Sequence, residues 1–192
     1  MRTLTLGADG YLGWPTCMYF SKRGHEVIGI DNYFRRMACI ELDCEPLIPN
    51  PNLIQRAKIW EALTGKKIHV HIGDVTDYQF LKYIFERYRP DTVIHYTEQP
   101  SVPYSMLNRD KAAITITNNL ISTLNVAYAV KIENPRKEAE EHYYNSKYTG
   151  LLELGLKPHF LTEEVLIGMF KVVGKYKANI QNHKIFRGIK WT

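Results

Sequence analysis

The chain has 192 residues, which is enough for one domain of ordinary size. Hydrophobic residues make up 45% of it and charged residues 23%, a composition that is typical of globular proteins and excludes a disordered or fibrous chain. The formal net charge is +5, but no run of basic residues is longer than two, so we expect no nucleic-acid partner.

A glycine triplet follows the first predicted strand, residues 3–6. Gly7, Gly10 and Gly13 lie between this strand and a predicted helix. Glycines at this spacing let the backbone turn tightly and bring the helix N-terminus close to a pyrophosphate. Because a side chain at Gly7 or Gly10 would block that approach, we interpret the triplet as a dinucleotide-binding loop. The alternative is an ordinary glycine-rich turn.

An acidic residue ends the next predicted strand, residues 27–30. Asp31 lies about 20 residues after the triplet, the separation at which a carboxylate binds the hydroxyl groups of an adenosine ribose. The same charge repels a 2′-phosphate, so we expect NAD rather than NADP. Arg35 and Arg36 leave an alternative open, because guanidinium groups pair with such a phosphate or else lie in a solvated loop.

The remaining elements alternate between strand and helix. Apolar periodicity and turn residues predict helices at 14–23, 53–63, 77–88 and 112–130, strands at 68–72 and 92–95, and an irregular stretch at 31–52. Strands that alternate with helices over short connections form a parallel sheet with right-handed crossovers. We therefore predict an α/β fold, a shortened Rossmann-like doubly wound parallel sheet with a small helical C-terminal segment.

Polar residues stand at two informative places in this pattern. Tyr96 and Thr97 follow the fourth predicted strand, where open α/β sheets bind ligands. Asn118 and Asn119 lie in the middle of the fourth predicted helix, where asparagine is intrinsically unfavourable. The pair therefore indicates a specific role, and a solvent-facing pair is the alternative.

The residue composition changes after the fourth predicted helix. Residues 133–141 are highly charged, and helices are predicted at 143–154 and 162–176, the second with Thr162 as N-cap. We divide the chain into an NAD-binding domain, residues 1–131, and a helical segment, residues 132–192.

Cysteine usage and hydropathy point to one compartment. The chain has three cysteines, an odd number, without a C-x-x-C pair or a secretory leader, which indicates reduced thiols and a cytoplasmic location. No apolar run approaches the length of a membrane span, so we expect no membrane partner.

Several motifs resemble those of the extended short-chain dehydrogenase/reductase superfamily, whose members remodel nucleotide sugars. They are Gly7-x-x-Gly10-x-x-Gly13, Asp31-Asn32, Gly73-Asp74-Val75 and Asn118-Asn119. Longer runs resemble the UDP-sulfoquinovose synthase family within that superfamily. These runs are residues 10–15, 31–36, 62–66, 98–106 and 118–126, with residues 134–136, 141–144 and 154–158 in the tail.

The resemblance implies a tightly held NAD, UDP-glucose as the substrate and sulfite as the sulfur donor. The implied route is oxidation at C4, elimination at C5–C6, addition of sulfite, and reduction by the same cofactor. The residues expected to bind NAD are Gly7, Gly10, Tyr11, Leu12, Gly13, Asp31, Asn32, Arg35, Arg36, Asp74, Val75, Tyr96, Thr97 and Asn118. The residues expected to face the UDP-sugar or sulfite are Gln99, Ser101, Tyr104, Arg136 and His142. A charged surface strip is the alternative for Arg136 and His142.

Three of the NAD-binding residues receive particular roles from the resemblance. The Asp74 carboxylate is expected to accept a hydrogen bond from the adenine amine, and Val75 to pack on the adenine ring. The alternative for both is a simple turn ahead of Asp77, the N-cap of the next helix. Asn118 is expected to contact the cofactor from the helix after the fourth strand.

The resemblance covers two parts of the family's pattern. Residues 1–131 resemble its N-terminal half and residues from 133 onward its C-terminal end, while the middle, which carries the catalytic threonine, tyrosine and lysine, is missing. We therefore assign no catalytic residue and expect NAD binding with little or no activity. The alternative is a shortened, non-catalytic dinucleotide-binding module. Its bare fourth strand would favour pairing with a second copy, so a homodimer is expected.

Two further patterns have ordinary explanations. Tyr143 and Lys147 have the superfamily's catalytic Y-x-x-x-K spacing, which places them on one face of a helix. They do not follow a fifth strand, so we interpret the match as coincidence and keep a rearranged reductase site as the alternative. His69 and His71 share a strand face without a cysteine or carboxylate partner, so we expect no metal.

Overall fold

The structure is a computed structural model that describes residues 1–99, 101–133 and 162–180. The chain forms two compact units. The first holds residues 1–41 and 50–136, and the second holds residues 42–49 and 137–192. The predicted boundary at residue 131 stays a prediction.

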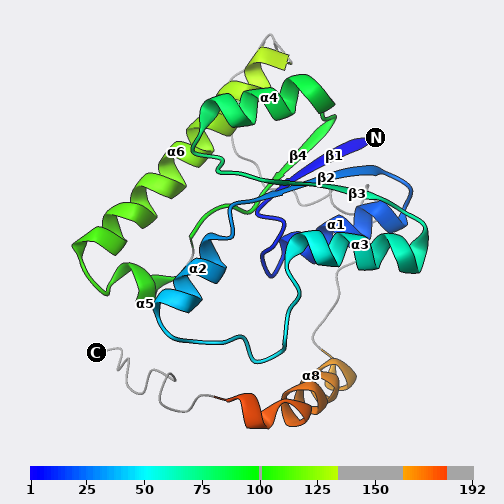
Figure 1. The fold of residues 1–192 in the computed structure, drawn as a ribbon, viewed down its shortest axis with the longest axis vertical. Coiled ribbons are helices and arrows are strands. Elements are labelled where there is room, and N and C mark those ends of the chain that lie inside the picture. Colours follow the sequence, from blue (N-terminus) through cyan, green and yellow to red (C-terminus); the bar gives the residue numbers. More distant parts are fainter. Residues whose placement is uncertain (100, 134–161, 181–192) are drawn as a thin grey trace. The chain divides into compact units, whose positions relative to one another are not determined.

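The first unit is built on a four-stranded parallel sheet (Figure 1). Its strands are β1 (Arg2–Leu6), β2 (Glu26–Asp31), β3 (Ile68–Ile72) and β4 (Thr92–His95). They lie in the order β3-β2-β1-β4, with Leu4 of β1 opposite Ile28 of β2 and Val93 of β4. The chain therefore builds outward from β1 in one direction and then crosses back to place β4 on the other side of β1.

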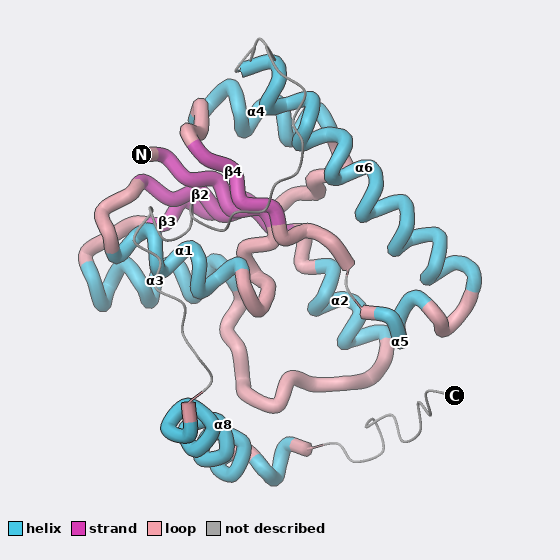
Figure 2. The backbone as a smooth tube through the Cα atoms, turned by 180° about the vertical axis from the view of Figure 1, so that it is seen from behind, coloured by secondary structure: helices cyan, strands magenta, loops and turns pink. Residues whose placement is uncertain are grey.

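Helices cover both faces of this sheet (Figures 1 and 2). Helices α1 (Gly13–Lys22) and α3 (Leu53–Thr64) pack on one face, and α4 (Tyr78–Tyr88) and α6 (Arg109–Glu133) on the other. The strands accordingly have apolar residues pointing both ways, as parallel sheets require. The first core contains Trp14, Cys17, Val27, Leu53 and Ile68, and the second contains Leu4, Leu6, Ile28, Ile30, Leu81, Ile84 and Phe85.

The predicted fold class is confirmed, as are all four predicted strands and all four predicted helices of this unit. The irregular stretch predicted at 31–52 is wrong in part, because α2 (Phe34–Glu41) lies within it. The Asn32 side chain starts this helix by accepting a hydrogen bond from the backbone N–H of Phe34, at 2.9 Å. A short helix, α5 (Val102–Ser105), also forms between β4 and α6, where no helix was predicted. Only Ala38 of α2 is buried, although Phe34, Met37 and Ala38 recur at helical spacing, a signal that sequence analysis did not use.

The described part of the second unit contains one longer helix. Helix α8 (Glu163–Lys175) begins at Thr162, whose hydroxyl oxygen accepts a hydrogen bond from the Val165 N–H at 3.4 Å, as predicted. A short 3-10 turn, η1 (Lys177–Asn179), follows, and the Asn179 side chain donates to the Leu47 carbonyl oxygen at 2.9 Å. The helix predicted at 143–154 and the Tyr143–Lys147 pair lie outside the described residues. None of the described helices has both the length and the apolar character that crossing a membrane requires.

Candidate functional site

A cavity of about 380 Å³ lies at the carboxyl ends of the four strands. It spans the point between β1 and β4 where the strand order reverses, which is where open α/β sheets bind ligands. The predicted site residues that line it are Gly7, Gly10, Tyr11, Leu12, Gly13, Asp31, Asn32, Arg35, Asp74, Val75, Tyr96, Thr97, Gln99 and Asn118. The fold thus brings together residues that are spread over more than a hundred positions of the chain.

The three glycines differ in what a side chain at each position would meet. A Cβ atom at Gly7, where φ is +82°, would overlap the carbonyl oxygen of Tyr96. A Cβ atom at Gly13 would overlap the carbonyl oxygen of Gly7, so the close approach of helix to strand excludes it. At Gly10 the same atom would lie 3.1 Å from the Gly7 carbonyl oxygen, with no other heavy atom within 4 Å. Gly10 is therefore the position where a side chain would project into free space beside the cavity.

The N-terminus of α1 is open toward the cavity. The position before the helix is Leu12, and no side chain caps the first turn. The first N–H groups of a helix carry partial positive charge and bind phosphate groups well. Together with Gly10, this terminus is a suitable place for a diphosphate.

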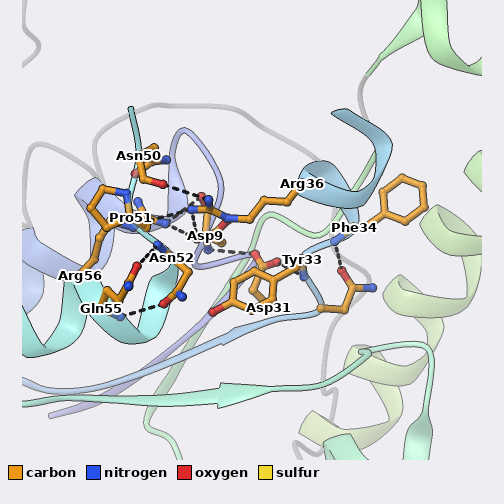
Figure 3. A network of polar contacts seen from close by, with 11 residues as sticks. Asp9, Asp31, Tyr33, Phe34, Arg36, Asn50, Pro51, Asn52, Gln55 and Arg56 are labelled. Atoms are coloured by element: carbon orange, nitrogen blue, oxygen red, sulfur yellow. Dashed lines mark hydrogen bonds and ion pairs between the residues drawn. The ribbon is translucent and has the colours of Figure 1, made fainter. Parts of the chain in front are cut away.

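Asp31 is held by two backbone N–H groups (Figure 3). Its carboxylate accepts a hydrogen bond from Asp9 N–H at 2.9 Å and one from Tyr33 N–H at 2.7 Å. Burial raises the pKa of this carboxyl above its ordinary value, and the two hydrogen bonds oppose the shift. The carboxylate is thus fixed in position at the cavity wall, with acceptor sites left for a ligand hydroxyl group.

Asp9, inside the glycine triplet, is paired with two arginines (Figure 3). Its side chain is 7% exposed and contacts Arg36 of α2 at 2.6 Å and Arg56 of α3. The Arg56 guanidinium also donates to the Asp9 carbonyl oxygen at 3.1 Å and lies over the Trp14 ring at 4.9 Å. These contacts tie the glycine loop to α2 and α3, and the paired charges avoid the large penalty of a lone buried carboxylate.

Asp74, after β3, is organised by its neighbours. Burial alone would raise the pKa of its carboxyl, but hydrogen bonds from Thr76 and Asn32 outweigh burial and lower the pKa. The Thr76 hydroxyl donates at 2.7 Å, the Thr76 N–H at 2.8 Å and the Asn32 amide at 3.0 Å. Asp77 caps α4, as the alternative held, while Asp74 and Val75 also line the cavity.

Asn118 and Asn119 hold the loop after β4. The Asn118 amide donates to the Thr97 carbonyl oxygen at 2.8 Å, and the Asn119 side-chain oxygen accepts from the Gln99 N–H at 2.7 Å. Because these bonds join the helix to the loop, the solvent-facing alternative is wrong. These hydrogen bonds explain why two residues that are unfavourable in mid-helix occur there. The sequence alone does not reveal them, because it does not show where the loop after β4 lies.

Asn125 plays the matching role for the loop after β3, and sequence analysis missed it. Its side chain is buried, and the amide nitrogen donates to the carbonyl oxygens of Val75 and Thr76, both at 2.9 Å. One helix, α6, therefore supports two of the loops that form the cavity.

Three predicted residues lie elsewhere in the structure. Arg36 is paired with Asp9 and does not line the cavity. Ser101 caps α5 by accepting from the Tyr104 N–H at 3.3 Å. Tyr104 is 5% exposed, packs edge-on against Phe34 and donates to Glu41 at 3.5 Å. Arg136 and His142 lie outside the described residues.

Four residues that were not predicted also line the cavity. They are Asp9, Phe34, Gly73 and Glu98. Gly73 could have been predicted from the sequence, since it directly precedes Asp74. In the structure, a Cβ atom at Gly73 would overlap the Phe80 ring. The position of Asp9 could not have been predicted, because its arginine partners are 27 and 47 positions away in the sequence. The described residues contain no group of three or more histidine, cysteine, aspartate or glutamate side chains suited to hold a metal ion.

Residues 3–146 match the family described as "NAD dependent epimerase/dehydratase family". The chain belongs to this family. Over 135 residues it is 44% identical to the UDP-sulfoquinovose synthase of Sulfolobus acidocaldarius, a match that covers 70% of this chain and 34% of that protein. Over 130 residues it is 42% identical to the chloroplastic UDP-sulfoquinovose synthase of Spinacia oleracea, covering 68% of this chain and 27% of that protein. The chain thus spans about a third or less of the length of these two relatives.

The fold is also similar to that of a solved epimerase structure. It is the UDP-glucose 4-epimerase from Bifidobacterium longum in complex with NAD+ and UDP, with a TM-score of 0.55 and 25% identity. The match covers 70% of this chain and 34% of that chain. These comparisons confirm the sequence resemblance to UDP-sulfoquinovose synthases and nucleotide-sugar epimerases.

Proposed function

We propose that this chain binds NAD in the cavity at the carboxyl ends of its strands. The observation that carries the proposal is the joint placement of Gly10, the uncapped start of α1 and the Asp31 carboxylate around one cavity. A diphosphate needs the first two and an adenosine ribose needs the third. Family membership and the NAD complex of the similar Bifidobacterium longum epimerase support the same cofactor.

Different residues of the chain would bind different parts of the cofactor. Gly10, Tyr11, Leu12 and Gly13 would hold the diphosphate, Asp31 and Arg35 the adenosine ribose, and Asp74 and Val75 the adenine. Tyr96, Thr97 and Asn118 would lie against the nicotinamide half, since they follow β4 on the other side of the reversal point. When bound, NAD supplies the acceptor and later the donor of a hydride.

We infer that the substrate class is a UDP-sugar, with UDP-glucose and sulfite as the specific pair. The two UDP-sulfoquinovose synthases that are 42–44% identical support this pair, and the UDP in the similar epimerase structure supports the class. Among the described residues, Gln99 and Glu98 on the cavity wall are suitably placed polar partners.

We expect little turnover from this chain. Oxidation of a sugar hydroxyl requires a base, and a tyrosine serves at neutral pH when a nearby ammonium lowers its pKa. The described cavity wall contains Tyr11 and Tyr96 but no lysine. The second candidate function, a non-catalytic dinucleotide-binding module, follows from this observation.

Two measurements test these proposals. Small molecules released from the purified protein are identified by mass, and NAD binding to ligand-free protein is measured by calorimetry. NAD alone supports the module, NAD with a UDP-sugar supports the enzyme, and a folded protein that takes up no NAD contradicts both. Normal turnover of UDP-glucose with sulfite would contradict the expectation of little activity.

A further inference from the structure

We propose that Asp9 is a specificity-determining residue, which disfavours NADP by keeping Arg36 from pairing with the 2′-phosphate. The inference rests on the proposed dinucleotide site and goes beyond it, because it assigns the choice of cofactor to a residue inside the glycine loop. We expect Asp31 at the end of β2 to disfavour the 2′-phosphate of NADP, and an unpaired Arg36 to favour it.

The Arg36 guanidinium has all three of its nitrogen atoms engaged. Its Nε donates to Asp9 at 2.6 Å and one terminal nitrogen donates to Asp9 at 3.0 Å, which makes the pair bidentate. The terminal nitrogens also donate to the carbonyl oxygens of Asn50 at 3.0 Å and Pro51 at 2.8 Å. Bidentate guanidinium–carboxylate pairs are among the strongest side-chain hydrogen bonds. A phosphate would therefore have to compete with a partner that is already well placed.

This pair lies beside the expected ribose site (Figure 3). The Asp9 N–H donates to the Asp31 carboxylate at 2.9 Å, so Asp9 and Asp31 are direct neighbours. The charge of Asp9 helps to raise the pKa of Asp31, and the charge of Asp31 helps to raise the pKa of Arg36. Arg36 is thus close enough to sense charge at the ribose position, while its bidentate pair with Asp9 occupies the guanidinium.

The charge count explains why Asp9 matters. Asp9 and Asp31 carry two negative charges, and Arg36 and Arg56 carry two positive charges, so this hydrogen-bonded group is neutral; Arg35 on the cavity wall adds one positive charge that every variant keeps. A 2′-phosphate would gain no net attraction from this group and would lie beside the Asp31 carboxylate. Replacing Asp9 by asparagine leaves one net positive charge and a guanidinium with only neutral partners. Because Arg36 then loses its bidentate carboxylate partner, its guanidinium becomes available to an anion.

The test compares the dissociation constants of NAD and NADP by calorimetry for the full chain. In Asp9→Asn, we expect the affinity for NADP relative to NAD to rise about tenfold or more, equivalent to about 1.4 kcal/mol. In Asp9→Asn/Arg36→Gln, which restores the neutral charge count, the ratio should return to its original value. Circular dichroism melting checks that each variant is folded. A purely structural role of Asp9 would weaken the binding of NAD and of NADP equally and would leave the ratio unchanged.

The outcomes separate this inference from the proposed function. If the unmodified chain is folded and binds neither cofactor, the dinucleotide site itself is wrong. If it binds NAD and the ratio is unchanged in folded Asp9→Asn, or stays raised in the double variant, then Asp9 does not act through Arg36. Should Asp9→Asn fail to fold, Arg36→Lys serves instead, since lysine cannot form the bidentate pair and should also raise the ratio.

Discussion

Replacing Asn125 by alanine should destabilise the first unit and loosen the side of the cavity that Asp74 and Val75 line. The Asn125 amide is the shared donor for the carbonyl oxygens of Val75 and Thr76, both at 2.9 Å, and the residue is 9% exposed. Alanine removes that donor from both carbonyl groups, and because Val75 is only 4% exposed, its carbonyl group has little access to water in exchange.

The size of the effect follows from these two bonds. A buried polar group that loses its partner costs about 1–3 kcal/mol, and here two carbonyl oxygens lose the same donor. Partial relaxation of the loop reduces the sum, so we expect the free energy of unfolding to fall by about 2–4 kcal/mol. Because the loop carries Asp74 and Val75, NAD affinity should fall as well.

Chemical denaturation with urea measures the first effect, and calorimetry measures the second. Thr123→Ala is the matched control on the same helix. Thr123 is exposed, and among the described residues its hydroxyl bonds only to the Asn119 carbonyl within α6, so a change within about 0.5 kcal/mol is expected. If Asn125→Ala were as stable as this control, the assignment of Asn125 as the support of the loop after β3 would be refuted.

Three other predictions test the site and its surroundings. Gly10→Ala places the new Cβ atom 3.1 Å from the Gly7 carbonyl oxygen, a tight contact that a small shift of the loop should relieve at a cost of at most about 1 kcal/mol in the free energy of unfolding. The affinity for NAD should fall at least about tenfold in calorimetry, and equal losses of both would contradict the assigned role. Burial raises the pKa of Cys17 from 9.0 to about 11, so the unfolded chain releases this proton first and stability should fall as pH rises from 9.0 to about 11, by roughly 1.4 kcal/mol per pH unit at most. Urea unfolding of Cys17→Ala should lack this part of the alkaline decline, and an identical decline in both proteins would rule it out. The pKa of Asp74 is lowered, so its stabilisation is present above its ordinary value of 3.8 and lost as pH falls below it. Asp74→Asn should therefore be less stable than the parent at pH 7 by about 1 kcal/mol and equal to it in acid, and a difference independent of pH would show that the charge is irrelevant.

The sequence was sufficient for the sheet because the strands obey a local rule. Each of the four is short and bounded by turn residues, and the glycine triplet and Asp31 mark the first crossover. Helix α2 was missed although Phe34, Met37 and Ala38 recur at helical spacing, because the whole stretch 31–52 was interpreted as one irregular segment. The role of Asp9 was missed for a different reason. Its two guanidinium partners come from α2 and α3, and only the folded chain brings them to the glycine loop.

Helix α6 shows why some functional residues escape a reading based on hydrophobic periodicity. Its buried side is formed by Ser122, Asn125 and Ala129, while Leu120 and Leu124 are 66% and 48% exposed. A rule that turns apolar residues inward would therefore choose the wrong face of this helix. The inward face carries small and amide side chains because it must approach the sheet closely and also donate hydrogen bonds to the loops after β3 and β4. The asparagines are thus unfavourable for the helix alone and favourable for the site it supports. For this reason the mid-helix asparagines of α6 are better indicators of the loops after β3 and β4 than its leucines are of the core.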